Sequence, residues 1–137
     1  MARIDMAHRI AFLLGRNGRT DRLHFQRNAA LLALAKGIAD LWSQARWPDT
    51  EPLLVAMSWV DPFHLIDPWM DGTLPTTIGV STFLFFSLLV RSAVLRARDV
   101  GWPPWTGLLT AVPYLNGIMT LVFALRAPKR RSIWDLV

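Results

Sequence analysis

The sequence predicts an all-α integral membrane protein with about three transmembrane helices and an interfacial amphipathic helix at its N-terminus. Two observations support this expectation. First, 53% of the 137 residues are hydrophobic, which is high for a soluble domain of this size. Second, the charges gather in short clusters beside long uncharged runs. With a formal net charge of +5, this placement favours contact with anionic phospholipids and no nucleic acid partner. We expect a single membrane domain over residues 1–137.

Residues 1–24 combine arginines with apolar residues at helical spacing. Ile4, Ala7, Ala11 and Leu14 recur every three or four positions among the arginines. This pattern indicates a basic amphipathic helix on the membrane surface, and a solvated basic tail is the alternative. We expect no cleavable secretory signal, because the short apolar stretch leads into more arginines without a small-residue cleavage site.

The segment 25–42 predicts membrane helix 1, although two charges interrupt it. A lysine at the centre of a membrane helix costs about 2.5 to 3.5 kcal/mol on insertion scales, which makes this segment marginal alone. Lys36 and Asp40 lie four positions apart and therefore share one helical face. We expect them to form an intramembrane ion pair that faces other helices of the bundle and not lipid.

The segment 43–72 is acidic and rich in proline and tryptophan. Its only base is Arg46, so the positive-inside rule predicts a non-cytoplasmic location. An Asp-Pro-aromatic unit occurs at 61–63 and again at 67–69. Each copy predicts a short helix with the aspartate as N-cap and the proline in the first turn. The apolar stretch 52–60 is too short to span a membrane and predicts an interfacial helix.

Two long apolar segments follow. Residues 73–95 predict membrane helix 2, because the first part of this segment carries no charge. Residues 100–125 are uncharged as well, but Pro113 and Asn116 interrupt them near the centre. This second segment either crosses as membrane helix 3 with a kink or turns back as a hairpin.

The basic clusters create a conflict of topology. The positive-inside rule directs the N-terminal cluster, residues 91–98 and the basic tail 126–137 to the cytoplasm. One crossing by 100–125 would separate the last two. A hairpin at 113–117 resolves the conflict, as does an additional crossing made from 52–66, and a violation of the rule is the third possibility. We expect a multi-pass protein with a cytoplasmic N-terminus and leave the side of the C-terminus open.

Two motifs stand out from the general composition. The first, G-R-x-x-R-x-x-F, covers residues 18–25 and places two arginines on one face of a helical turn, after a glycine that allows a tight turn. The second, R-A-R-D-V-G-W-P-P-W, covers residues 96–105. Its glycine can end one helix and its second proline can begin the next. The predicted turn and interface residues are Gly18, Gly101, Trp102, Pro103, Pro104, Trp105, Pro113 and Asn116.

The charges of both motifs predict a common cluster. An aspartate between arginines of both motifs would join the loop after helix 2 to the start of helix 1, because unpaired charge at membrane depth is costly. The alternative is that the arginines bind phosphate, from a lipid headgroup or a soluble ligand, since arginine offers bidentate donors to phosphate. The residues of this charge clamp or phosphate site are Arg19, Arg22, Arg96, Arg98 and Asp99.

Together these residues resemble a bacterial inner-membrane family known as the domain of unknown function, number 805. That family carries G-R-x-x-R-x-x-F-W before its first membrane helix and R-R-L-x-D-x-G before its last. Gln26 replaces the tryptophan, Ala97 stands where leucine is usual, and the doubled arginine has no counterpart here. The resemblance covers residues 14–128 and implies an integral membrane protein of several helices and no reaction. The matching residues are Gly18, Arg19, Arg22, Phe25, Arg96, Asp99, Gly101, Pro103, Pro104, Trp105, Pro113 and Asn116.

The sequence predicts a non-enzymatic protein. It has no cysteine, no nucleophile with a paired base, no glycine-rich phosphate loop and no histidines at ligand spacing, so we expect no catalytic residue, metal or cofactor. We expect an accessory or scaffold subunit of a larger bacterial inner-membrane complex, with other membrane protein subunits and anionic phospholipids as partners. The alternative is a lipid-handling or transport component, a homo-oligomer in which Lys36 and Asp40 line a path.

Overall fold

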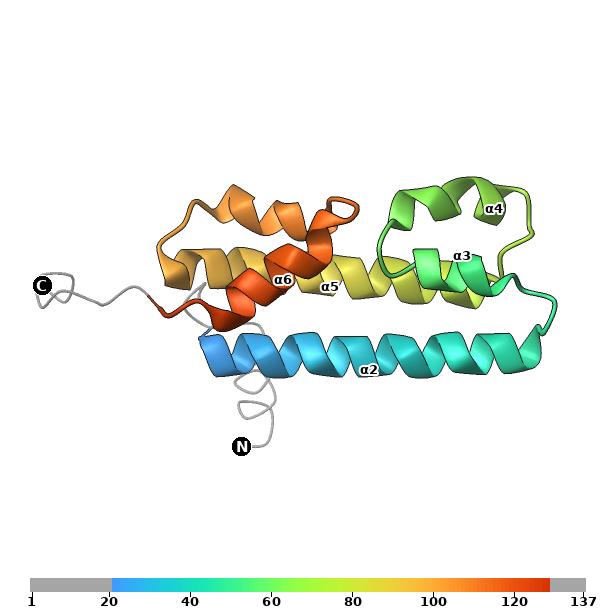
Figure 1. Ribbon diagram of the computed structural model, residues 1–137, viewed down its shortest axis with the longest axis horizontal. Coiled ribbons are helices and arrows are strands. Elements are labelled where there is room, and N and C mark those ends of the chain that lie inside the picture. The colour runs from blue at the N-terminus through green and yellow to red at the C-terminus, as the bar shows by residue number, and fades with distance from the viewer. Residues whose placement is uncertain (1–20, 129–137) are drawn as a thin grey trace, which may run out of the picture.

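Every regular element in the described part of the chain is helical. The computed structural model describes residues 21–128, and the all-α prediction is confirmed for them (Figure 1). Nearly all of the predicted segment 1–24, including Gly18 and Arg19, and residues 129–137 of the predicted tail lie outside the described residues. In chain order the elements are α2 (Arg22–Arg46), α3 (Pro52–Met57), the 3-10 helix η1 (Pro62–Leu65), α4 (Ile66–Met70), α5 (Thr76–Val100), the 3-10 helix η2 (Pro104–Ala111) and α6 (Leu115–Leu125).

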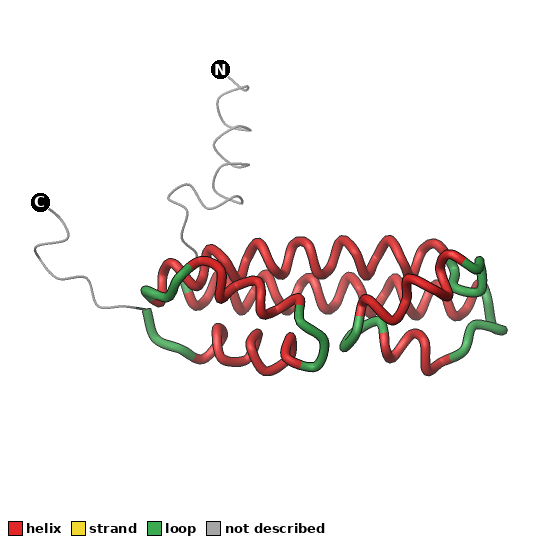
Figure 2. The backbone as a smooth tube through the Cα atoms, turned by 90° about the horizontal axis from the view of Figure 1, so that it is seen from above, coloured by secondary structure: helices red, strands yellow, loops and turns green. Residues whose placement is uncertain are grey.

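Helices α2 and α5 lie side by side along the length of the molecule and run in opposite directions (Figures 1 and 2). Each has 25 residues and is therefore about 37 Å long. Helix α2 extends beyond the predicted range 25–42 at both ends, whereas α5 begins later than the predicted 73 and continues beyond 95. At their C-terminal ends polar residues continue each helix until a stop signal. These signals are Pro48, which disfavours helical backbone at the preceding residue, and Gly101, which ends α5 in the left-handed conformation with φ at 81°.

The remaining elements form two helical hairpins that pack along α5 from opposite ends of the molecule (Figure 1). In the first hairpin α3 runs inward and η1 with α4 runs back. In the second hairpin η2 runs inward and α6 runs back. The hairpins meet near the middle of α5, where the backbone N of Tyr114 donates to the carbonyl of Val60 at 3.2 Å. Their tips are thus joined to each other.

The segment 100–125 turns back and is not one continuous helix. The turn lies between η2 and α6, and its backbone includes Tyr114 with φ at 61°, a left-handed conformation that is uncommon outside glycine. Pro113 cannot donate a backbone hydrogen bond, so a continuous α-helix through it would lack one bond. As a result, Arg98 at the end of α5 and Arg126 after α6 lie at the same end of the molecule (Figure 1).

The two Asp-Pro-aromatic units differ in what they do. Asp61 is the N-cap of η1, and its carboxylate accepts from the backbone N atoms of Phe63 and His64. The second copy was expected to begin its own helix in the same way, and that expectation is wrong. Because η1 continues directly into α4, the cap position falls on Leu65 and Asp67 lies within the first turn of α4.

Both hairpins approach α5 closely at a glycine. Gly79 of α5 lies under the ring of Trp69, where an added Cβ would stand 3.3 Å from ring atoms. In the second hairpin an added Cβ on Gly107 would stand only 2.4 Å from the backbone N of Val94. Since backbone cannot move aside as a flexible side chain can, η2 packs this tightly on α5 only with glycine at position 107.

A few charged side chains are buried beside the apolar core, while many large apolar side chains are exposed. Lys36, Asp40 and Arg96 are at most 4% exposed. Large apolar side chains on the outer faces of the long helices are about half exposed or more, among them Leu31, Leu34, Ile38, Leu41, Phe83 and Leu84. Among the described helices, α5 alone is both long and apolar enough to cross a membrane.

Candidate functional site

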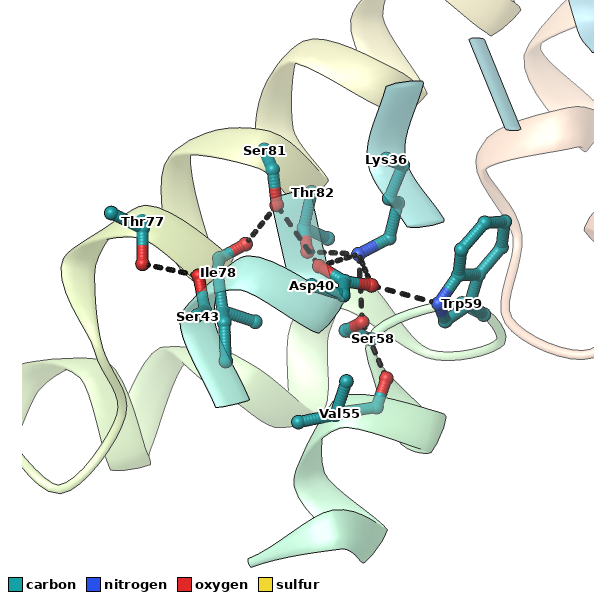
Figure 3. Close-up of polar contacts among 10 residues, drawn as sticks. All are labelled: Lys36, Asp40, Ser43, Val55, Ser58, Trp59, Thr77, Ile78, Ser81 and Thr82. Carbon is teal, nitrogen blue, oxygen red and sulfur yellow. Dashed lines mark hydrogen bonds and ion pairs between the residues drawn. The ribbon is translucent and has the colours of Figure 1, made fainter. Parts of the chain in front are cut away.

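A cluster of polar side chains lies between the second half of α2 and the first third of α5, beside the inner end of α3 (Figure 3). We call it the central polar cluster: Lys36, Asp40, Ser58, Trp59, Ser81 and Thr82. Its core is an ion pair in which the Nζ of Lys36 lies 2.8 Å from Oδ2 of Asp40. The i, i+4 spacing on α2 places both groups on its inner face, where their side chains are 1% and 6% exposed.

The ammonium of Lys36 also bonds to the two elements that face α2. It donates to Oγ of Ser58 at 2.8 Å and to Oγ1 of Thr82 at 3.1 Å. Ser58 in turn donates to the carbonyl of Val55, so its hydroxyl both accepts and donates. Because an ammonium has three hydrogens, the carboxylate and the two hydroxyls account for all of its donors. The lysine thus connects α2, α5 and the first hairpin.

The carboxylate of Asp40 is held by three elements as well. The indole Nε1 of Trp59 donates to its Oδ2 at 2.9 Å, and the hydroxyl of Ser81 lies 3.3 Å from its Oδ1. Lys36 also lies over the Trp59 ring, 5.0 Å from the centroid. The cluster therefore carries one positive and one negative charge, and each charge is fully hydrogen-bonded within the protein.

A second polar centre lies at the opposite half of α5, around Arg96, whose side chain is completely buried. Its Nε donates to the carbonyl of Phe123 at 3.1 Å, its Nη2 donates to the carbonyl of Arg126, and its Nη1 pairs with Asp99. The last carbonyls of a helix have no partners within it. Arg96 therefore caps the C-terminus of α6 and joins this helix to α5.

Gln26 completes this C-terminal cap from the other long helix. Its Nε2 donates to the carbonyl of Ala124 at 2.8 Å. Together, α2 and α5 therefore supply donors for three carbonyls at the end of α6, those of Phe123, Ala124 and Arg126. Nothing in the sequence singles out Gln26 except that it replaces the usual tryptophan of the motif.

The predicted charge cluster forms only in part. Asp99 pairs with Arg96 as expected, but Arg98 is exposed and makes no ion pair with any described residue. Arg22 is exposed at the start of α2, and Arg19 lies outside the described residues. Arg22 makes no ion pair with Asp99, and a link from Asp99 to Arg19 stays a prediction. Arg96 instead connects to the end of α6, because the α6 hairpin brings orphan carbonyls to the buried guanidinium.

The predicted turn residues lie around the same end and at the hairpin tips. Trp102 packs against Phe123 with ring centroids 5.7 Å apart. The guanidinium of Arg126 lies over the Trp102 ring, 4.5 Å from its centroid. Pro103 and Pro104 precede and begin η2, and Trp105 is exposed. The remaining residue of the set, Asn116, donates from Nδ2 to the carbonyl of Trp59 at 2.8 Å and ties the two tips together.

An apolar groove of about 340 Å³ lies between α2 and α6, with α5 as its floor. Alanines of α2 form one wall, a stretch of α6 from Gly117 to Ala124 forms the other, and Phe85 and Leu89 form the floor. Trp59 and Asn116 line it at the hairpin tips. The groove thus extends from the tips toward the end of α6 that Arg96 caps.

Within residues 21–128 no group of three or more His, Cys, Asp or Glu side chains is arranged to hold a metal ion. No family model, no curated protein and no solved structure matches the chain.

Proposed function

We propose that the chain is a small membrane protein in which α2 and α5 cross the bilayer and the two hairpins enter it from opposite sides. The observation that supports this most is the exposure of many large apolar side chains along α2 and α5, together with the burial of Lys36, Asp40 and Arg96. Soluble monomers rarely expose large contiguous apolar patches. In lipid the same outer surface is in its preferred medium, and every buried charge has a partner.

The charges at the two ends support one orientation in the membrane. The end that holds the start of α2 and the ends of α5 and α6 is basic, whereas the segment that carries α3, η1 and α4 is acidic. By the positive-inside rule the basic end belongs in the cytoplasm. With the hairpin over 100–125, all three basic clusters then share that side. Location in the bacterial inner membrane and kinship with the family that the motifs resemble are part of the same proposal.

The role we propose is that of an accessory or scaffold subunit that binds a transmembrane helix of another protein. Its polar clusters are paired internally, which suits a rigid support. The outer face of α2 carries a row of exposed side chains at alternating spacings of three and four, the pattern of a helix-packing seam. We call this row the α2 seam: Leu31, Leu34, Ile38 and Leu41. Because α2 is only marginally apolar, a protein neighbour along the seam would stabilise it in the bilayer.

Single-cysteine labelling tests the topology, since the chain has no cysteine of its own. We expect Asp71→Cys to react with a membrane-impermeant maleimide on intact spheroplasts. Arg98→Cys and Ala127→Cys should react only after the membrane is permeabilised, because the hairpin returns the chain to the side it left. Labelling of positions 98 and 127 from opposite sides would contradict the hairpin topology.

Purification in mild detergent with an uncharged tag tests the subunit role. We expect a larger membrane complex to co-purify, and we expect Leu34→Ala with Ile38→Ala to reduce its yield by roughly tenfold or more, as for truncation of central interface residues. The control is Phe83→Ala with Leu84→Ala, which shortens exposed side chains on α5 and should leave the yield unchanged. If both pairs act alike, the α2 seam is not the interface.

The alternative is a homo-oligomeric transport or lipid-handling component. The structure supports these two roles to different degrees. A transport path along Lys36 and Asp40 is supported less, because both groups are buried and already hydrogen-bonded on several sides. Contact with lipid is supported more, because the apolar groove has a defined place and shape. A homo-oligomer in the purification above would favour this alternative.

A further inference from the structure

We propose that the groove between α2 and α6 binds one acyl chain of an anionic phospholipid, with the phosphate at the basic end of the molecule. This inference rests on the proposed placement of α2 and α5 across the membrane. It goes beyond the subunit role, because it names a ligand class and a site. Three features of the groove carry it: its size, its lining and the charge at its end.

The groove is long and open enough to hold an extended hydrocarbon chain, with a volume of about 340 Å³. An acyl chain is only as wide as one methylene chain, so it can lie along the groove. The volume is also within the range of roughly 300 to 1,000 Å³ that small-molecule sites occupy.

The lining of the groove is apolar and shaped by small residues. Ala29 and Ala33 leave space along α2, and Gly117 leaves space along α6, where an added Cβ would meet nothing within 4 Å. The one amide in the lining, Asn116, is already bonded to the carbonyl of Trp59. The space is therefore open to hydrocarbon, and the polar group at its inner end does not require water.

The groove leads along α2 toward a cation. Arg22, Gln26, Ala29 and Ala33 follow one another at spacings of four, three and four, so they share one face of the helix. Gln26 is engaged with the end of α6, and Arg22, one turn further, is exposed. Arg126, just after α6, is exposed at the same end (Figure 1). An anionic phosphate at the interface suits this position.

The acidic groups near this end are already engaged. Asp99 pairs with Arg96, and the carboxylate of Asp21 accepts from the backbone N of His24. That backbone hydrogen bond is the main cause that lowers the pKa of Asp21, so its carboxylate stays ionised at the helix N-terminus. Arg22 and Arg126 make no ion pair with a described residue. The guanidinium of Arg126 lies over the Trp102 ring, but the residue is exposed, so the N–H groups at the edge of the guanidinium can still donate to a phosphate.

Native mass spectrometry after delipidating washes tests the proposal. We expect the wild type to retain one phospholipid when offered phosphatidylglycerol, with a preference over phosphatidylcholine on the order of thirtyfold, as two interfacial arginines would give. Gly117→Leu should abolish the retained lipid by filling the groove. Ser87→Leu, which places the same leucine side chain at an exposed position of α5 outside the groove, should retain it. If Gly117→Leu fails to fold, Ala29→Leu fills the same space from α2.

The charge at the end of the groove has its own test. Arg22→Gln with Arg126→Gln should remove the preference for the anionic lipid while the groove still takes a chain. Retention that survives Gly117→Leu and Ala29→Leu would overturn the proposal, as would a wild type that holds no phospholipid. A dimer that Gly117→Leu converts to monomer would also overturn it, because a second copy would then fill the groove. The cysteine labelling above tests the membrane placement separately, so the two failures are distinguishable.

Discussion

Asp40→Leu is expected to destabilise the protein by about 3 to 5 kcal/mol, the range for removing one partner of a buried ion pair. The substitution leaves the ammonium of Lys36 buried and without its counter-charge, and it also leaves the indole N–H of Trp59 without its acceptor. Because Lys36 and Trp59 connect the first hairpin to α2, this hairpin should loosen first. Thermal or denaturant unfolding of the purified protein in detergent measures the change.

The double variant Lys36→Met with Asp40→Leu separates the charge from the shape of the site. Removing both charges should recover most of the lost stability, since neutral groups of similar volume replace a buried ion pair at little net cost. Lys36→Met alone should be damaging, because it leaves the carboxylate of Asp40 uncompensated. If the two single changes simply add in the double variant, the pair does not act as a unit and the assignment fails.

The central polar cluster marks where prediction from the sequence ends. The spacing of Lys36 and Asp40 was enough to place both charges on one helical face and to expect a pair. Their further partners, Ser58, Trp59 and Thr82, come from positions 19 to 46 residues away. Serine, threonine and tryptophan are frequent throughout the chain, so nothing local distinguishes these three. The inward course of α3 brings Ser58 and Trp59 to α2, and the packing of α5 along α2 brings Thr82.

The hairpins show the same limit at the level of topology. Hydropathy cannot distinguish a kinked crossing from a hairpin over 100–125, because both bury the same apolar residues and break at Pro113. The decisive features are tertiary. Gly107 allows η2 to lie directly on α5, and Arg96 supplies donors for the carbonyls at the end of α6. The positive-inside rule favours a common side for Arg98 and Arg126. A hairpin satisfies the rule, but so does an additional crossing, so the charges alone do not choose between them.

Arg96 and Arg98 offer a matched pair of variants, because they are the same residue two positions apart on one helix. Arg96→Leu should cost about 3 to 5 kcal/mol, since it leaves Asp99 unpaired and removes donors from the carbonyls of Phe123 and Arg126. Arg98→Leu should change stability by no more than about 0.5 kcal/mol, because the side chain is exposed and makes no ion pair with a described residue.

Unfolding of both variants in the same detergent distinguishes the capping role of Arg96 from a general effect of basic residues at this end. Limited proteolysis should cleave the Arg96→Leu variant near α6 faster than the wild type, because the helix loses its tie to α5. A shared charge cluster, in which both arginines pair with Asp99, would make the two substitutions similarly harmful. The structure predicts a difference of several kcal/mol between them, because only Arg96 reaches the end of α6.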